Sequence, residues 1–330
     1  MQVINPAQNS VTNLLEEINC PLCSSNLNKV IASGKDYEYK TITETFHFKE
    51  CINCGHLYLS PRPKISTASI LYPPNYYTSS TKGNYGWRNK LLFWLQKIIL
   101  TRRIKPILKI LPKNATVLEI GFGDGSLLKA IRNFRSDLTL LGVDLKVPPD
   151  IKTKLEKEEI ITYECAFEKF NKLSSGVDLI IMTQLIEHFW DLSSCVKKIA
   201  EILNPNGHVI LTTPNGNGYD RQLFKSGAWG GYYWPRHFNI FTPKSIEKLF
   251  DSSNLRVKTI KQLVCPVQWG FSLKYLFDRK NINWGANLIN PFNPFFLAIF
   301  TICDLIAIFL GLESSNMMCI FTKNQKLHLK

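Results

Sequence analysis

The sequence predicts an α/β protein with a doubly wound parallel sheet, and three observations support this fold class. Short apolar runs alternate with amphipathic or charged segments at a regular pitch from about residue 116 to residue 213. The run 177–183 is apolar almost throughout, which is typical of a strand covered on both faces. A glycine-rich turn at 121–125 joins the first apolar run to a helical pattern, as in nucleotide-binding βα units.

The N-terminal part, residues 1–80, is expected to form a small zinc-ribbon lobe and a linker. Its cysteines form two Cys-x-x-Cys pairs: Cys20, Cys23, Cys51 and Cys54. Thiolates two residues apart can grip one ion from a tight turn, so we expect a structural zinc with four sulfur ligands. The alternating stretch 37–48 predicts the hairpin of the ribbon. A dithiol redox pair is the alternative, and His47 and His56 are expected to be bystanders.

Two proline-rich stretches, 57–63 and 71–77, are expected to end the lobe and form the linker. The second contains the adjacent pair Tyr76 and Tyr77. We treat this pair as a candidate part of a substrate site. Ordinary packing of the linker against the main domain is the alternative.

Residues 81–330 are expected to form the main domain, and its first segment is basic. The formal net charge of the chain is +14, and the stretch 51–118 contains eleven lysines and arginines but no acidic residue. This block favours an anionic partner: a phosphate-bearing substrate, nucleic acid or an anionic membrane surface. A solvated basic face is the alternative. Within the block, a basic amphipathic helix is expected at 88–111, kinked or restarted at Pro106. We expect it to pack on the core sheet, and a membrane-surface helix is the alternative.

One segment, residues 117–126, carries the most information about function. Its first half is expected to form a buried strand with Glu119 near the end, and a helix is expected from Ser126 onward. Three glycines lie between the two elements: Gly121, Gly123 and Gly125. Glycines at such a turn let the backbone bend sharply and leave bare main chain against which a ligand can lie.

An acidic residue stands at the end of the second expected strand, 138–143. This residue, Asp144, follows the glycines by about twenty positions, where a ribose-binding carboxylate sits in nucleotide-binding βαβ units. In the GxGxxG fingerprint two residues precede the last glycine, whereas here there is one. We therefore expect a cofactor with a ribose but not NAD.

An aromatic loop at 214–242 follows the fifth expected strand, at the ligand edge of the sheet. It contains Trp234, Arg236 and His237, and aromatic rings of this kind stack against sugar or aromatic faces. His237 is the first candidate for a catalytic base, because imidazole titrates near neutral pH. His188, which follows the strand at 177–183, is the second candidate. The alternatives are a hydrogen-bonded loop histidine and a histidine that shapes the cofactor pocket.

The C-terminal part contains a strongly apolar helix at 294–311, placed between expected strands at 255–264 and 317–322. This helix is shorter than the ~20 residues that a spanning helix needs and has Asp304 in its middle. We expect a buried or membrane-surface helix. The N-terminus lacks an export signal, and the cysteines outside the two pairs occur singly. We therefore expect a cytoplasmic protein, with peripheral contact at the inner face of the membrane.

Several motifs along the chain carry a family resemblance. They are Glu119-x-Gly-x-Gly-x-Gly, Gly-Val-Asp144, Val-Asp178-Leu-Ile, Gln184-x-x-Glu-His188 and Leu-x-Pro-x-Gly207. In this order they resemble the class I S-adenosylmethionine-dependent methyltransferases, over residues 108–323 approximately. The resemblance implies a Rossmann-like seven-stranded sheet with a helical insertion before the last strand, and S-adenosylmethionine as cofactor.

The resemblance also implies roles for individual residues. The three glycines would cradle the methionine portion, and Asp144 would accept hydrogen bonds from both ribose hydroxyls. Cys165 and Ala166 would lie near the adenine, and Gln184 near the sulfonium. The cofactor site implied in this way has the following members: Glu119, Gly121, Phe122, Gly123, Gly125, Asp144, Cys165, Ala166 and Gln184.

The two cysteine pairs together with the proline-rich stretches resemble a subgroup that has an N-terminal zinc ribbon and includes sugar and polysaccharide-pathway enzymes. The pattern His237-x-x-x-Phe-Thr242 resembles the segment with the proposed base in zinc-ribbon sugar C-methyltransferases. Those enzymes have a glutamate before the histidine, where this chain has Arg236. Arg236 instead suggests an anionic group on the acceptor.

We predict an enzyme that methylates a small molecule or glycan, at the hydroxyl of a sugar or lipid-linked saccharide, in polysaccharide biosynthesis. One alternative is an RNA methyltransferase that uses the ribbon and the basic segment. Nucleic acid is the less favoured partner, because the loop lacks an Asn-Pro-Pro-Tyr type of site for base nitrogens. The other alternative is a non-catalytic, membrane-associated scaffold that keeps the fold.

Overall fold

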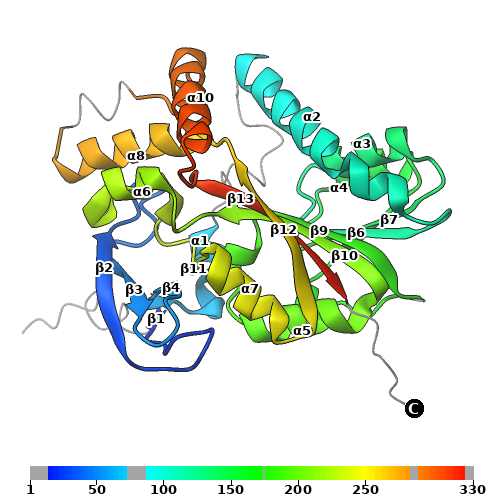
Figure 1. The fold of residues 1–330 in the computed structure, drawn as a ribbon, viewed down its shortest axis with the longest axis horizontal. Helices are drawn as coiled ribbons and strands as arrows, with labels where there is room; N and C mark the ends of the chain where they lie inside the picture. The colour runs from blue at the N-terminus through cyan, green and yellow to red at the C-terminus, as the bar shows by residue number, and fades with distance from the viewer. Residues whose placement is uncertain (1–13, 73–86, 174, 283–288, 324–330) are drawn as a thin grey trace, which may run out of the picture.

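A seven-stranded sheet forms the centre of the molecule in the computed structural model, which describes residues 14–72, 87–173, 175–282 and 289–323. The strand order is β12-β13-β10-β9-β6-β7-β8 (Figure 1). All strands run parallel except β13, which is antiparallel to both of its neighbours. The strands are β6 Thr116–Ile120, β7 Thr139–Asp144, β8 Ile160–Glu164, β9 Val177–Thr183, β10 Leu203–Pro214, β12 Leu255–Leu263 and β13 Asn316–Lys323.

Helices cover both faces of this sheet (Figure 1). One face packs against α2 Trp87–Ile110, α3 Ser126–Phe134 and α4 Pro149–Glu156. The other face packs against α5 Leu192–Ile202 and α7 Pro243–Asp251. Along β9, Leu179 and Ile181 face the first helical layer and Ile180 and Met182 face the second, as the two-residue period of a strand requires. The predicted doubly wound sheet is confirmed.

Local sequence explains where α7 begins. Thr242 caps α7, accepting a hydrogen bond from the Ser245 backbone while the Ser245 hydroxyl accepts one from the Thr242 N–H. Pro243 fits the first turn because its missing N–H would have no partner there. The sequence predicts a kink or a second helix at Pro106, but the structure has one helix from residue 87 to residue 110.

The N-terminal lobe has its own four-stranded sheet, and one of its strands comes from the distant aromatic loop. The order is β11-β4-β3-β2, in which β11 Asn239–Ile240 pairs with β4 Leu57–Leu59. The central pair is β2 Asn28–Gly34 and β3 Phe46–Cys51, which corrects the predicted hairpin at 37–48. Residues 37–45 form the connection, because Asp36 binds the backbone of Tyr39 and Thr41 and turns the chain there.

The loop at 214–242 also fills the core of the lobe. Trp229, Tyr232, Trp234 and Phe238 are buried against Phe48 and its neighbours on the lobe sheet. The indole of Trp234 lies so close to Gly34 that any side chain at that position would clash with it. The loop is therefore packed hydrophobic structure that joins the lobe to the main domain. It contains the short helix α6 Tyr219–Leu223.

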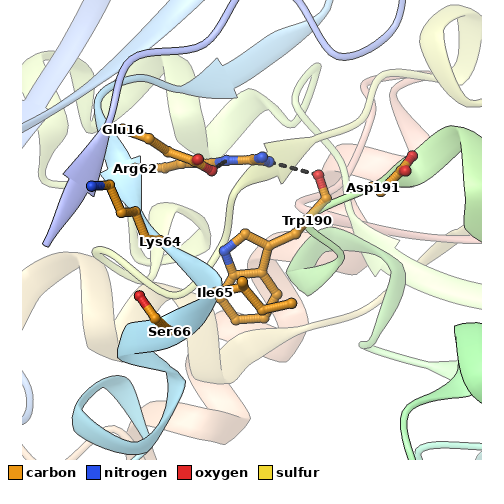
Figure 2. Close-up of a pocket in the computed structure, with 7 residues that line it drawn as sticks. All are labelled: Glu16, Arg62, Lys64, Ile65, Ser66, Trp190 and Asp191. Carbon is orange, nitrogen blue, oxygen red and sulfur yellow. Dashed lines mark hydrogen bonds and ion pairs between the residues drawn. The ribbon is translucent and has the colours of Figure 1, made fainter.

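The Pro-Arg-Pro motif forms a second junction between the two parts (Figure 2). Arg62 donates a hydrogen bond of 2.7 Å to the carbonyl of Trp190 in the main domain, and the Trp190 indole donates to Pro63. Arg62 also pairs with Glu16 of the lobe at 2.8 Å. These residues belong to a small two-stranded sheet, β1 Leu15–Glu16 and β5 Arg62–Pro63, which is followed by α1 Ala68–Leu71.

A helical insertion separates β12 from β13, as predicted. It consists of α8 Pro266–Arg279 and α10 Pro294–Phe309, which pack against each other. The last residue of β12, Leu263, pairs with Asn316 at the start of β13. The insertion therefore leaves and rejoins the sheet at the edge where the parallel strands end. Within the described residues, no helix has both the length and the apolar character required to cross a membrane.

Candidate active site

The glycine turn lies at the carboxyl end of β6 and has three residues in the left-handed region. The φ angles of Gly121, Gly123 and Gly125 are +70°, +55° and +68°. A Cβ atom at Gly121 or Gly125 would clash with a neighbouring leucine side chain, so these two glycines are needed for packing. A Cβ at Gly123 would meet no atom within 4 Å. Gly123 thus offers open main chain to a ligand.

Asp144 stands directly beside the turn, at the end of β7. Its Oδ2 atom accepts a hydrogen bond of 3.0 Å from the Gly123 N–H, which ties the glycine turn to the carboxylate. Burial raises the pKa of Asp144, partly offset by hydrogen bonds from backbone N–H groups. The carboxylate retains lone pairs beyond those bonds and can accept hydrogen bonds from a diol.

Cys165 and Ala166 follow β8 on the other side of Asp144. The Cys165 N–H donates to the Asp144 carbonyl at 2.9 Å, and both residues are half-buried. The structure therefore brings Cys165, Ala166, Asp144 and the glycine turn to one edge of the sheet.

Phe122 differs from the predicted cofactor-binding residues around it. Its side chain is 4% exposed and packs in the hydrophobic core over Gly142, where an added Cβ would clash with the phenyl ring. Phe122 can present only its main chain to a cofactor, because the ring is needed to fill the space above the glycine in β7. Glu119 is also buried, within β6.

Gln184 follows β9 and adopts a positive φ of 49°, which is unusual for a side chain of this size. Its amide nitrogen donates to Thr212 Oγ1 and to Asn316 Oδ1, both at 3.2 Å. These bonds hold the amide across three neighbouring strands, β9, β10 and β13. Gln184 lies at the same sheet edge as Gly123 and Asp144, as expected from the sequence.

A cluster of Glu187, His188 and His237 is formed by residues that follow β9 and β10 in the chain. The ligand-type atoms of these three side chains lie within 4.8 Å of one another, and the two imidazole rings are 4.7 Å apart. The Thr213 hydroxyl donates to Glu187 Oε2 at 2.9 Å, whereas the preceding residue, Thr212, binds Gln184 from the opposite face of the strand. Strand β10 therefore positions both the cluster and the amide.

Hydrogen bonds determine which nitrogen of each histidine is available. Nδ1 of His237 lies 2.8 Å from the Gly231 carbonyl, and Nδ1 of His188 lies 3.0 Å from the Arg236 carbonyl. A carbonyl only accepts, so both Nδ1 atoms carry the proton and both Nε2 atoms have a lone pair. Nε2 of His237 is 3.9 Å from Glu187 Oε1, an atom with no hydrogen-bond partner. The cluster can accept a proton or hold a divalent metal ion.

Burial controls the charge state of this cluster. It raises the pKa of Glu187 to about 8 and lowers the pKa of His188 to about 4. Burial, together with His188, holds the pKa of His237 well below its ordinary value. At neutral pH the histidines are therefore neutral and the carboxyl group is protonated. A neutral imidazole is the form that a general base requires.

The structure corrects the expected role of Arg236. Its guanidinium is fully buried, and all five of its N–H groups have partners inside the protein. Two of them bind Asp36, and the others bind Leu71, Trp234 and Thr41. Arg236 is therefore a structural residue with no donor available for an anionic acceptor.

Trp234 is likewise buried in the protein interior. Its indole N–H donates to the Gly227 carbonyl, and the residue is 1% exposed. Tyr76 and Tyr77 lie outside the described residues. Sequence reasoning overlooked Tyr72, whose hydroxyl lies 3.3 Å from His188 Nδ1. It also omitted Glu187 from the site, although this residue directly precedes His188 in the recognised motif.

The four cysteines of the lobe form a compact cluster, in which Cys20 and Cys54, and also Cys23 and Cys51, have Sγ atoms 3.5 Å apart. All four sulfur atoms lie within 4.8 Å of one another. Four Zn–S bonds of about 2.3 Å in a tetrahedron require sulfur separations of roughly 3.8 Å. The geometry is therefore compatible with zinc. Burial opposes ionisation of Cys51, but backbone N–H groups lower its pKa to about 7.

The fold and the site together define a class of protein. The strand order with an antiparallel last strand, the glycine turn after β6 and the acidic residue after β7 are those of the class I S-adenosylmethionine-dependent methyltransferases. Comparison with protein families agrees with this assignment. The chain belongs to the family described as "Methyltransferase domain", whose model matches residues 94–260, half of the chain.

Curated relatives are methyltransferases as well. The mitochondrial ubiquinone biosynthesis O-methyltransferase of Homo sapiens is 24% identical over 163 residues, which are 44% of this chain and 42% of that protein. The ubiquinone biosynthesis O-methyltransferase of Escherichia coli O127:H6 is 30% identical over 117 residues, 34% of this chain and 48% of that protein. The chain thus spans less than half the length of these two relatives.

Solved structures include a coclaurine N-methyltransferase bound to N-methylheliamine and SAH, with a TM-score of 0.47 and 16% identity. That match covers 69% of this chain and 72% of the other. The cyclopropane synthase MmaA2 from Mycobacterium tuberculosis matches with a TM-score of 0.44 and 16% identity, covering 67% of this chain and 82% of the other. Both TM-scores are below 0.5, and neither match bears on the acceptor.

Proposed function

We propose that the protein transfers the methyl group of S-adenosylmethionine to a hydroxyl group of a small-molecule acceptor. The observation that carries this proposal is the pair His188 and His237, whose rings are 4.7 Å apart and whose Nδ1 atoms are held by backbone carbonyls, which leaves both Nε2 lone pairs for a proton. A hydroxyl acceptor must lose a proton on methylation, and this pair can receive it. The curated relatives, which are named O-methyltransferases, support the same type of acceptor atom.

In the proposed reaction the chain contributes alignment and proton acceptance. When bound, S-adenosylmethionine supplies a methyl group already activated on a sulfonium. Gly123 would offer its main chain to the methionine portion and Asp144 would bind the ribose, which would leave the methyl group near Gln184. His237 Nε2 would accept the proton of the acceptor hydroxyl as the oxygen bonds to the methyl carbon, while the methyl–sulfur bond breaks and S-adenosylhomocysteine leaves. Glu187, 3.9 Å from that nitrogen, would stabilise the resulting imidazolium once its own carboxyl group ionises.

For the acceptor, we propose a sugar or a lipid-linked saccharide, by resemblance to the zinc-ribbon subgroup in polysaccharide biosynthesis. An anionic acceptor is no longer expected, because Arg236 is paired with Asp36 inside the protein. RNA methylation and a non-catalytic scaffold have no support among the relatives named above. A structural zinc held by the four cysteines and a cytoplasmic location are further parts of the proposal.

Methyl transfer can be tested with the full-length protein and isotope-labelled S-adenosylmethionine. Calorimetry should detect binding of the cofactor and of S-adenosylhomocysteine. Label should then pass to one member of a panel that contains nucleotide sugars, lipid-linked saccharides and hydroxylated aromatic compounds. Mass spectrometry of the product identifies the methylated atom. Absence of any S-adenosyl ligand binding would refute the proposal, and methylation at carbon or nitrogen would refute its choice of oxygen.

A further inference from the structure

The outward face of α10 is strongly apolar and open to solvent. Positions spaced by three or four residues lie on one side of a helix and define what we call the α10 face. Its members are Phe295, Ile299, Ile302, Ile306 and Phe309, with Leu305, Leu310 and Leu312 adjoining them. Phe309 is 88% exposed and Phe295 is 68% exposed. Contiguous exposed patches of this kind mark an interaction surface in soluble proteins.

The charged side chain of this helix lies on its inner side, toward the protein. Between residues 294 and 312 the only charged side chain is Asp304, and it is fully buried. Asp304 accepts hydrogen bonds from the Cys265 N–H at 2.7 Å and from the Trp269 indole at 3.0 Å. Phe300 stacks on the Trp269 ring from the same side. The inner side of α10 is thus fixed to α8, and its outer side has neither charge nor packing partner among the described residues.

The length of α10 limits the ways in which it can meet a membrane. A helix of 16 residues extends about 24 Å, which is less than the ~30 Å hydrocarbon core of a bilayer. Its inner side is also bound to α8. The α10 face can therefore enter the boundary between headgroups and acyl chains without the helix crossing the bilayer.

A basic helix lies on the same side of the molecule. In Figure 1, α10 and the first part of α2 both rise above the sheet at the top of the view, and α8 runs to the left below the top of α10. The sequence of α2 has seven lysines and arginines and no acidic residue, and Arg102 and Lys109 are exposed. An uncharged apolar face accompanied by a basic helix is complementary to an anionic lipid surface, because each lysine or arginine near such a surface adds to the attraction.

From these observations we infer that the α10 face docks the protein on an anionic lipid bilayer. The insertion rejoins the sheet at Asn316, whose side chain accepts a hydrogen bond from Gln184. Docking through α10 therefore brings the cofactor edge of the sheet to the membrane. An acceptor with a lipid tail could reach the site without leaving the bilayer. The docking stands independently of methyl transfer and is tested separately.

The test measures sedimentation of the full-length protein with vesicles. One set contains phosphatidylcholine and phosphatidylglycerol, and the other contains phosphatidylcholine alone. The double variant Ile302→Glu/Phe309→Glu places charges on exposed positions of the α10 face. The control Ile65→Glu changes a residue that is 68% exposed on the N-terminal lobe. Cofactor binding by calorimetry verifies that each variant is folded.

We expect the unmodified protein and Ile65→Glu to bind anionic vesicles, more weakly as salt is added. The double variant should bind about tenfold less or worse, because two large apolar side chains no longer leave water. Equal binding by the double variant would overturn the inference, as would equal binding to neutral vesicles. A dimer that does not bind vesicles and that the double variant converts to monomer would also overturn it. That result would assign the α10 face to a second copy of the chain.

Discussion

Arg236 and Asp36 form a bidentate ion pair, with both N–H···O distances at 3.0 Å and 200 residues of sequence between them. Both side chains are fully buried. The pair joins the connection between β2 and β3 in the lobe to the residue that precedes His237. The same arginine presents its carbonyl to His188 Nδ1. The lobe therefore helps to position the two histidines of the candidate active site.

Removing the charge of Asp36 should destabilise the fold. In Asp36→Asn the guanidinium remains buried without its counter-ion, and breaking a buried pair in this way costs about 3–5 kcal/mol. The measurement is the free energy of unfolding in urea. Asp150→Asn is the matched control, because its pair with Lys154 is exposed and contributes at most about 1 kcal/mol. Equal losses of unfolding free energy in the two variants would show that the buried pair contributes no more to stability than the exposed pair.

The difference in unfolding free energy between the unmodified protein and Asp36→Asn should depend on pH. Burial acts to raise the pKa of Asp36, but the hydrogen bonds and charge of Arg236 outweigh it, so the pKa is lowered. Because the pKa of Asp36 is lower in the folded protein, Asp36 of the unfolded chain is protonated first as the pH falls. The stabilisation of the fold by ionised Asp36 is therefore complete above the ordinary pKa of 3.8. The difference in unfolding free energy should shrink as the pH falls below about 4. A difference that grows on acidification would contradict this.

Replacement of Asp144 should weaken cofactor binding. Asp144→Ala removes the carboxylate proposed to bind the ribose and also the acceptor for the Gly123 N–H. Hydrogen bonds to a charged group contribute about 1.5–3 kcal/mol each, so the dissociation constant for S-adenosylhomocysteine should rise at least about tenfold. Calorimetry measures this change, with Asp150→Asn again as control. An unaltered dissociation constant would exclude the ribose role.

Loss of His237 should affect turnover more than cofactor binding. His237→Gln keeps a polar side chain but removes the imidazole lone pair, and loss of a general base lowers kcat by about 10²–10⁴. Steady-state kinetics with a saturating acceptor measure this, and the cofactor affinity should change by less than about threefold. His208→Gln is the control, because that histidine lies in β10 away from the cluster. Full turnover by His237→Gln would exclude the proposed base.

The cysteine cluster should bind one zinc ion per chain. Cys51→Ser removes one of four ligands, so the metal content measured by mass spectrometry should fall to about one-tenth or less. The stability of the lobe should fall with it. Cys303→Ser, which changes a half-buried cysteine in α10, should leave the metal content unchanged. Retention of zinc by Cys51→Ser, or no zinc in the unmodified protein, would refute the assignment.

The sequence was most informative where structure depends on neighbouring residues. Strands β6 and β9 have the predicted bounds, because a buried strand between turns leaves a continuous apolar run. The glycine turn and Asp144 were found because their spacing is local. Residues of the candidate site that depend on distant contacts were harder to assign. Arg236 resembles a substrate ligand until Asp36, far away in the chain, is seen to bind it.

The same reason explains the error over the aromatic loop. Its tryptophans and tyrosines have the composition of a sugar-binding surface, and no local pattern shows that β11 pairs with β4 in the lobe. Only the tertiary structure reveals that the rings face the lobe core. Glu187 was visible in its motif, but its proximity to His237 depends on the path of the loop.

The strand that β11 adds to the lobe determines when the lobe can be completed during synthesis. The N-terminal sheet lacks its edge strand and much of its core until the ribosome has produced residues 228–240. By then β6, β7, β8, β9 and β10 have all been made. The lobe is therefore not a portable module that can be cut off near residue 80 and fused to another protein. Its sheet and core are completed only when the loop of the main domain has been made.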